Sequence, residues 1–186
     1  MRKSAIILAL VPMKTKVLHI LWERGGSEPM AGINDVSDYI IVKTSEAGVS
    51  MNLLKLQKLL YYCEAWSQAF YDKPLTGELF QAWVHGPVNR SVYDRYKDSK
   101  VLYSDVTVSD INSSFRFESL SEKERAHIDS VLEAYGKYSG TELELMTHRE
   151  APWVRARGNC RSSERCEETI DPKFMGTYYK ARLQAQ

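Results

Sequence analysis

The sequence has few cysteines, no excess of charge of either sign and no long hydrophobic run. Its three cysteines, Cys63, Cys160 and Cys166, are an odd and sparse set that favours reduced thiols over a disulfide framework. The 25 basic residues nearly balance the 24 acidic ones, so we expect no nucleic-acid partner. The apolar run at residues 6–11 is too short to span a bilayer and lacks a following cleavage site, which predicts a cytoplasmic protein with no membrane partner.

Patterns that would hold a cofactor or a metal are also scarce. The chain has no glycine-rich loop of the kind that cradles phosphates, and we expect no cofactor and no metal. Cys160 and Cys166 could provide two zinc ligands with His148 as a third, but five intervening residues are not the short spacing of structural zinc sites. The alternative interpretation is two free loop thiols.

Composition predicts one globular domain preceded by an extension. The chain is 44% apolar and 26% charged, and a chain of 186 residues can bury a sizeable core without disulfides. Residues 23–29 combine charges with Gly and Pro, which predicts a loop. Residues 1–29 are either a flexible arm or a start-site artefact with Met30 as the true start. We expect the domain to span residues 30–186.

Hydrophobic periodicity predicts a mainly α-helical fold, a compact single-domain bundle with at most a short β-hairpin or strand pair. A first helix is expected after an N-cap at Asn34 or Asp35, and it should stop at Gly48. A longer central helix should follow Ser50 or Asn52. Its apolar stripe is expected at Leu53, Leu56, Leu60, Cys63 and Phe70, widened by Leu59, Tyr62 and Trp66, with Lys55, Lys58 and Glu64 on the opposite side.

Start and stop signals predict the later elements. In chain order we expect first a short strand within residues 78–84 and a helix from Pro87 to about Lys97. Two later helices should begin at capping boxes, one at Ser121 and Glu124 and one at Thr141 and Glu144, and Pro152 should interrupt the second of them. A last helix is expected from Pro172 after the N-cap Asp171. Residues 98–119 have no clear period, so loops with short extended segments are expected there.

Three segments, taken in order, resemble the Panacea domain family, a phage-associated group of GepA-like and SocA-like antitoxins. They are KLQKLLYY at residues 55–62, AWVHGPV at residues 82–88 followed by Val92 and Tyr93, and residues 143–153. The closing segment, residues 170–179, is similar to the family's last helix more loosely. The resemblance implies a helical antitoxin that binds a cognate toxin protein directly and is not an enzyme. It also implies an alternative, an adaptor that delivers a toxin to the Clp protease.

The resembling segments divide into expected contact residues and expected structural residues. Because aromatic and arginine side chains near loops are typical interface anchors, we expect toxin contacts at His85, Arg90, Tyr93, His148 and Arg149. Structural roles are expected for Lys58, Trp83, Gly86, Pro87, Val88, Thr147, Pro152 and Trp153, with Pro152 and Trp153 forming a buried plug. A further alternative is an enzyme that uses His85, His148 and Glu150, with a metal or Cys63 as nucleophile.

Overall fold

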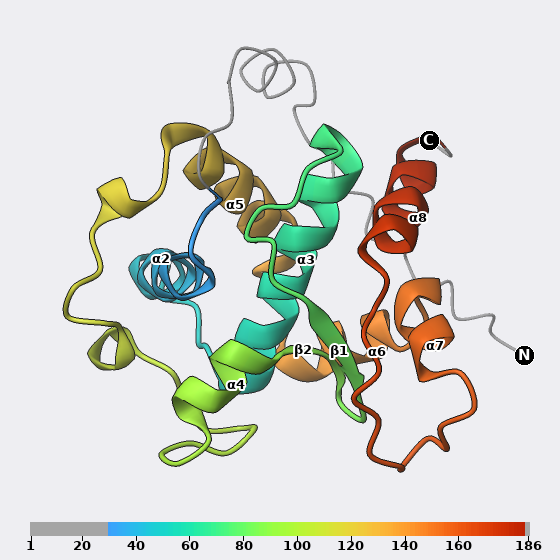
Figure 1. Ribbon diagram of the computed structural model, residues 1–186. Helices are drawn as coiled ribbons and strands as arrows, with labels where there is room; N and C mark the ends of the chain where they lie inside the picture. Colours follow the sequence, from blue (N-terminus) through green and yellow to red (C-terminus); the bar gives the residue numbers. More distant parts are fainter. Residues whose placement is uncertain (1–29, 185–186) are drawn as a thin grey trace, which may run out of the picture.

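The computed structural model describes residues 30–184, so the predicted extension, residues 1–29, lies outside the described range (Figure 1). Within that range the chain is mainly helical with a single two-stranded sheet, which confirms the predicted fold class. None of the helices between residues 30 and 184 combines the length and apolar character needed to cross a bilayer. The elements are α2 (Ile33–Glu46), α3 (Leu53–Tyr71), β1 (Phe80–Trp83), β2 (Gly86–Asn89), α4 (Arg90–Tyr96), α5 (Glu122–Tyr135), α6 (Gly140–Thr147), α7 (Ala151–Arg157) and α8 (Pro172–Gln184), with 3-10 turns at Val108–Asp110 and Phe117–Ser119.

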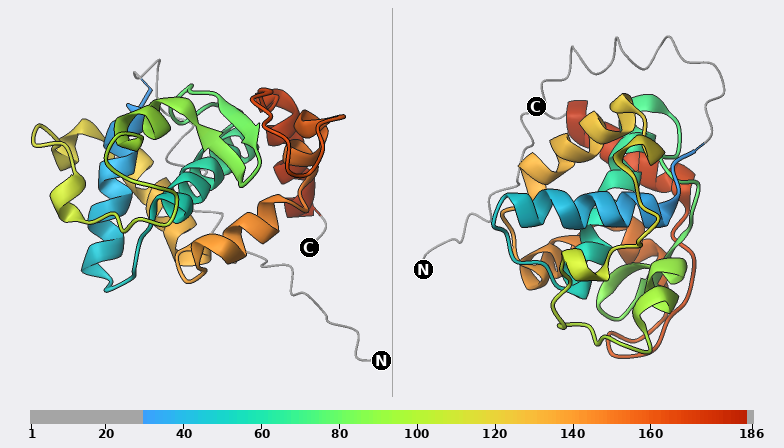
Figure 2. Two further views of the ribbon diagram at one scale, coloured as in Figure 1. Left: turned by 90° about the horizontal axis from the view of Figure 1, so that it is seen from below. Right: turned by 90° about the vertical axis from the view of Figure 1, so that its left-hand side faces the viewer.

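Helix α3 runs through the centre of the fold and contacts most of the other elements. Helices α2, α5, α6 and α8 and strand β2 all pack against it, and Figures 1 and 2 show it enclosed from several sides. Consequently its buried residues are not confined to one stripe. Lys55, Lys58 and Glu64, predicted on the outward face, are all buried, so that prediction is wrong.

The buried polar residues of α3 hold backbone groups of neighbouring irregular segments. The Lys55 amine donates a hydrogen bond to the carbonyl of Gly136, at 2.8 Å. The Glu64 carboxylate accepts hydrogen bonds from the backbone N–H and the hydroxyl of Thr76, both at 3.0 Å. A buried backbone group without a partner costs free energy, so these side chains stabilise turns that no helix or sheet satisfies.

Helices α3 and α5 begin at their predicted caps. The Asn52 side chain accepts a hydrogen bond from Lys55 N at the start of α3. Ser121 and Glu124 form the predicted capping box of α5. The N-cap of α2 is instead Gly32, so Asn34 and Asp35 lie inside the first turn, where an acidic side chain faces the positive end of the helix dipole.

The capping box of α6 lies two residues earlier than predicted. Ser139 accepts a hydrogen bond from Glu142 N, and the Glu142 carboxylate accepts one from Ser139 N. The pair Thr141 and Glu144 therefore does not cap the helix. Glu144 is free to contact other elements, and this contact forms part of the site described below.

Strands β1 and β2 form an antiparallel hairpin in which Trp83 lies opposite Gly86 and Ala82 opposite Pro87. Pro87 was predicted to open a helix, but it lies in β2, where an edge strand tolerates its missing N–H. Helix α4 begins three residues later, and the Asn89 side chain caps it by accepting from Val92 N at 3.0 Å.

The segment between α7 and α8 runs along the other edge of β1. Ala82 N donates to the carbonyl of Glu168, and Ile170 N donates to the carbonyl of Phe80, both at 2.8 Å. Asp171 then caps α8, as predicted, by accepting from Lys173 N at 2.9 Å. The hairpin is therefore flanked by a loop from the C-terminal part of the chain.

Candidate functional site

The buried amine of Lys58 lies where the three resembling segments meet. Its Nζ donates a hydrogen bond to the carbonyl of Pro87 at 3.0 Å. Gly86 has a backbone φ of 93°, and a Cβ there would lie 2.6 Å from Lys58 Cε and 2.8 Å from Thr147 Oγ1. A glycine is therefore needed at this position, both for the backbone conformation and for the close approach of α3 and α6.

Burial decides the charge of this lysine. The Lys58 side chain is fully buried, and this loss of hydration lowers its pKa to about 7, although the Glu144 carboxylate opposes the shift. The amine is therefore far less basic than that of an ordinary lysine. A buried lysine in this state is held by the fold at a considerable cost in stability.

Glu144 acts electrostatically on Lys58 and lies close to two histidines, and we call these four residues the lysine cluster. His85 Nδ1 lies 2.9 Å from the Glu144 carboxylate, and His148 Nε2 lies 4.0 Å from the same oxygen. Desolvation lowers the pKa of His148, and the nearby Lys58 amine lowers it further. The site therefore brings together two of the predicted contact residues through an acid that the sequence assigned to a helix cap.

Trp153 connects the lysine cluster to the hairpin. Its ring stacks on the His148 imidazole with centroids 4.2 Å apart, and its Nε1 donates to the carbonyl of Trp83 at 3.0 Å. Pro152 is buried, but Trp153 is only half-buried. The buried plug predicted from Pro152 and Trp153 therefore agrees with the structure for Pro152 and only in part for Trp153, which packs against the core but leaves part of its surface exposed.

The structure does not bring the three proposed enzyme residues together. Glu150 turns into the core, where its carboxylate accepts hydrogen bonds from Tyr179 and Arg182, the latter at 2.7 Å. Cys63 is fully buried, and burial raises the pKa of its thiol, which disfavours the thiolate needed for nucleophilic attack. His85 and His148 instead share Glu144.

The alternative zinc set lacks a third ligand. Within residues 30–184, no group of three His, Cys, Asp or Glu side chains is placed to hold a metal ion. His148 stacks on Trp153, while Cys160 and Cys166 are free thiols beside each other.

A groove of about 540 Å³ opens beside the hairpin, and we call it the hairpin groove. It lies between the hairpin, the start of α3, the segment after α4 and the loop before α8, and most of its lining is apolar. Its lining residues are Leu53, Gln57, Trp83, Val84, His85, Val88, Tyr93, Lys97, Lys100, Val101, Leu102, Arg165 and Cys166. His85 belongs to both the groove and the lysine cluster, so the two features are continuous.

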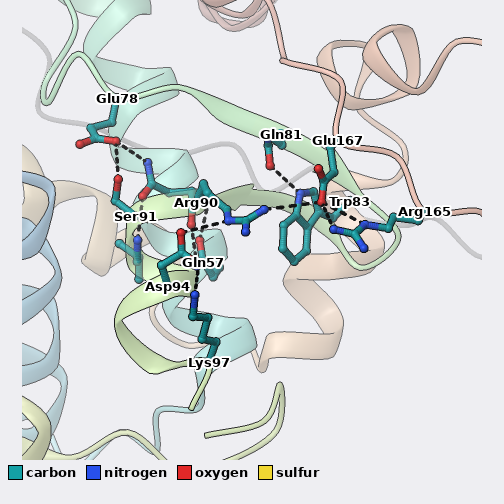
Figure 3. A network of polar contacts seen from close by, with 12 residues as sticks. Gln57, Glu78, Gln81, Trp83, Arg90, Ser91, Asp94, Lys97, Arg165 and Glu167 are labelled. Carbon is teal, nitrogen blue, oxygen red and sulfur yellow. Dashed lines mark hydrogen bonds and ion pairs between the residues drawn. The ribbon is translucent and has the colours of Figure 1, made fainter. Parts of the chain in front are cut away.

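One wall of the hairpin groove carries a stack of two aromatic rings and an arginine, of which Figure 3 shows Trp83 and Arg90 with the polar partners of Arg90. The rings of Trp83 and Tyr93 meet edge to face, with centroids 4.7 Å apart. The Arg90 guanidinium lies 5.9 Å from the Trp83 ring centroid and 5.6 Å from that of Tyr93. Ion pairs with Asp94 at 3.1 Å and Glu167 at 3.6 Å hold Arg90 in place. These side chains are held in position before any partner binds.

The expected contact residues are distributed unevenly over this site. His85 and Tyr93 line the groove, Arg90 stacks beside it, and His148 lies behind Glu144 against Trp153. Arg149 is exposed after the end of α6.

Sequence reasoning missed the opposite wall of the groove. Val101 and Leu102 come from a segment without periodicity, and the side chain of Val101 is 73% exposed. An exposed valine in an irregular loop was the one available signal. Glu144 was also missed as a contact of the histidines, although its spacing of four residues from His148 places the two on one helix face.

Comparison with known families identifies the chain. The sequence profile of the family described as "Antitoxin SocA-like, Panacea domain" matches residues 56–154, which is more than half of the chain. The match includes the resembling segments almost completely, from the central helix to Trp153. The protein belongs to the SocA-like Panacea domain family.

A curated relative agrees with this assignment. The protein called "Antitoxin SocA" of Caulobacter vibrioides (strain NA1000 / CB15N) is 27% identical over 124 residues. The match covers 63% of this chain and 66% of the relative, just under two thirds of the relative's length. No solved structure shows significant similarity to the chain. Family membership supports an antitoxin role.

Proposed function

We propose that this protein is the antitoxin of a bacterial or phage toxin–antitoxin pair, and that it neutralises its toxin by binding it directly at the hairpin groove. The observation that carries the proposal is that the family's own hairpin segment builds this apolar surface. Trp83, Val84, His85 and Val88 of that segment line the groove, and Tyr93 follows them on α4. A segment shared by a family of binding proteins is a reasonable place for the shared function.

The physical character of the groove fits a protein partner. Tryptophan, tyrosine and arginine are the residues most enriched at binding hot spots, and the stack of Trp83, Tyr93 and Arg90 presents all three. A groove of about 540 Å³ can accept a few side chains, whereas a stable interface buries about 800 Å² on each partner. The groove would therefore be the anchor point within a larger contact surface.

The charges around the groove suggest the nature of the anchoring segment. The charged residues among its lining are the cations Lys97, Lys100 and Arg165, whereas the acids that pair with them lie outside it. Electrostatic complementarity favours a partner segment with acidic residues beside apolar ones. We therefore expect the toxin to present an apolar segment with at least one flanking carboxylate.

The test is a titration of a toxin by this antitoxin. The product of the adjacent gene is first assayed for lethality without this protein, and its purified activity is then titrated. We expect inhibition to saturate at a fixed molar ratio, and Tyr93→Ala to weaken binding at least about tenfold.

A matched control comes from a second aromatic and arginine pair. Phe174 lies under Arg155, whose Cζ is 4.4 Å from the ring centroid, and neither residue lines the groove. Phe174→Ala should leave binding unchanged. Equal binding by folded Tyr93→Ala, Arg90→Ala and Phe174→Ala variants would contradict the groove as the contact surface.

Assays with the same toxin also distinguish two alternative functions, a protease adaptor and an enzyme. If the protein acts as an adaptor for the Clp protease, protection should disappear in a host that lacks the protease, whereas a direct inhibitor keeps protecting. If the protein is an enzyme, an amount far below one molar equivalent of the toxin should inactivate all of the toxin. Loss of that inactivation in folded His85→Ala or His148→Ala variants would then identify the lysine cluster as catalytic.

A further inference from the structure

Cys160 and Cys166 lie close enough to bond with little movement. Their sulfur atoms are 2.8 Å apart, and this distance exceeds the length of an S–S bond by less than about 1 Å. Cys160 is partly exposed and Cys166 is buried. Arg157 holds the intervening loop, because its guanidinium donates to the carbonyl oxygens of Arg161 and Glu164, the latter at 2.9 Å. The two thiols are therefore brought together by a defined loop conformation.

We propose that Cys160 and Cys166 are a redox-sensitive pair that a peroxide converts reversibly into a disulfide in the wall of the hairpin groove. The sulfur of Cys160, the more exposed of the two, attacks a peroxide oxygen, the O–O bond breaks, and Cys160 becomes a sulfenic acid as water leaves. The sulfur of Cys166 then attacks that of Cys160, the S–O bond breaks and a second water leaves. The two thiols lose two protons and two electrons in total, and a dithiol reductant reverses the change.

The surroundings of the pair set the conditions of this reaction. The hydrogen bond to Cys166 raises the pKa of the Cys160 thiol, which lowers its thiolate fraction at neutral pH, so oxidation should be slow there and faster at higher pH. The Arg157 guanidinium opposes that shift, and Glu164 adds to it. Cys63 is fully buried in the core and should not react under the same conditions.

Oxidation would act on the groove because Cys166, one member of the pair, belongs to its wall. Arg165 and Cys166 line the groove, and the chain that follows is hydrogen-bonded to β1 through Glu168. A bond between residues 160 and 166 would close the loop that directly precedes the segment hydrogen-bonded to β1. Any effect on toxin affinity rests on the proposed function, whereas disulfide formation does not.

The test uses the full chain and hydrogen peroxide. Protein treated with peroxide is denatured and alkylated to block free thiols, digested with trypsin without reduction and analysed by mass spectrometry. Trypsin cleaves after Arg157, Arg161 and Arg165, which separates the two cysteines into residues 158–161 and 166–173. We expect these two peptides to be recovered linked, about 2 Da lighter than their sum, and to separate after reduction. The peptide with Cys63 should remain alkylated, as the internal control.

Native digestion measures the effect on the groove wall. Cleavage of the folded protein after Arg161 and Arg165 should be several-fold slower once the disulfide has formed, and Cys160→Ser should abolish this protection. Three results would overturn the proposal: alkylated Cys160 and Cys166 after peroxide treatment, disulfide-linked dimers in place of the intramolecular link, or equal cleavage before and after oxidation. A linked peptide with unchanged toxin binding would leave the redox pair intact and count against the groove as the toxin contact.

Discussion

Replacing Lys58 with methionine should make the protein more stable at neutral pH. Methionine has a similar length and no charge, so it can occupy the same space in the core without an amine to desolvate. Folding lowers the pKa of Lys58 from its ordinary value of 10.5 to about 7 because the side chain is fully buried. The substitution therefore removes a group that the folded state holds unfavourably.

The magnitude follows from that pKa difference. One pKa unit corresponds to about 1.4 kcal/mol, so the protonated amine costs the folded state roughly 5 kcal/mol below pH 7. This cost fades as pH rises from about 7 toward 10.5, because the folded state then holds a neutral amine while the unfolded chain is still protonated. The substitution also leaves the Pro87 carbonyl without its donor, a loss of about 1 to 3 kcal/mol. The net gain at pH 7 should be about 1 to 3 kcal/mol.

Urea unfolding followed by tryptophan fluorescence provides the assay. Between pH 7 and pH 9 the wild-type protein should gain roughly 2 kcal/mol relative to Lys58→Met, because the groups outside the lysine cluster titrate equally in both. Lys73 is exposed and serves as the matched control. Lys73→Met should keep the pH dependence of the wild type.

Two results would refute this reasoning. A Lys58→Met protein less stable than the wild type by about 1 kcal/mol or more at pH 7 would mean that Lys58 is charged and stabilised by Glu144. A stability difference that does not change with pH would mean that the lysine does not titrate in this range. In either case the amine would be a paired cation within the lysine cluster.

Three other predictions concern stability and can be checked by unfolding measurements. Gly86→Ala should cost about 2 to 4 kcal/mol, because the new Cβ would overlap its neighbours at a positive φ. Gly48→Ala, also at a positive φ but with open space around it, should cost clearly less. Trp153→Ala should cost about 2 kcal/mol, below the range of about 3 to 5 kcal/mol for a fully buried tryptophan, and a larger loss would show that the ring is more deeply buried than its partial exposure indicates. A chain that starts at Met30 should keep its melting temperature, and a loss of several degrees would show that residues 1–29 contribute to the folded domain.

The sequence was most informative where a structural signal is local. The capping box of Ser121 and Glu124 and the caps at Asn52 and Asp171 involve hydrogen bonds that span two or three residues. Such bonds depend little on the rest of the fold, so they can be read from spacing alone. The capping box at Ser139 shows the limit, because the equally plausible Thr141 lies two residues away in the same segment.

The burial of α3 could not be read in this way. Charged residues are rarely buried, so Lys58 and Glu64 were assigned to a solvent-facing side. Their partners, the Pro87 carbonyl and the backbone of Thr76, lie on segments that reach α3 only in the folded chain. Periodicity describes how side chains alternate along one element, and it contains no information on how many neighbours enclose that element.

The same distinction between local signals and long-range contacts applies to the candidate site. The sequence by itself determined the helical class, the main helix positions and the family resemblance, because each rests on residues close together along the chain. Only the tertiary structure placed His85 beside Glu144, turned Glu150 into the core and brought Val101 into the same groove as Trp83. These contacts depend on how the hairpin, the loop after α4 and helix α6 pack around α3, and such long-range packing is set by the shape and burial of the whole domain.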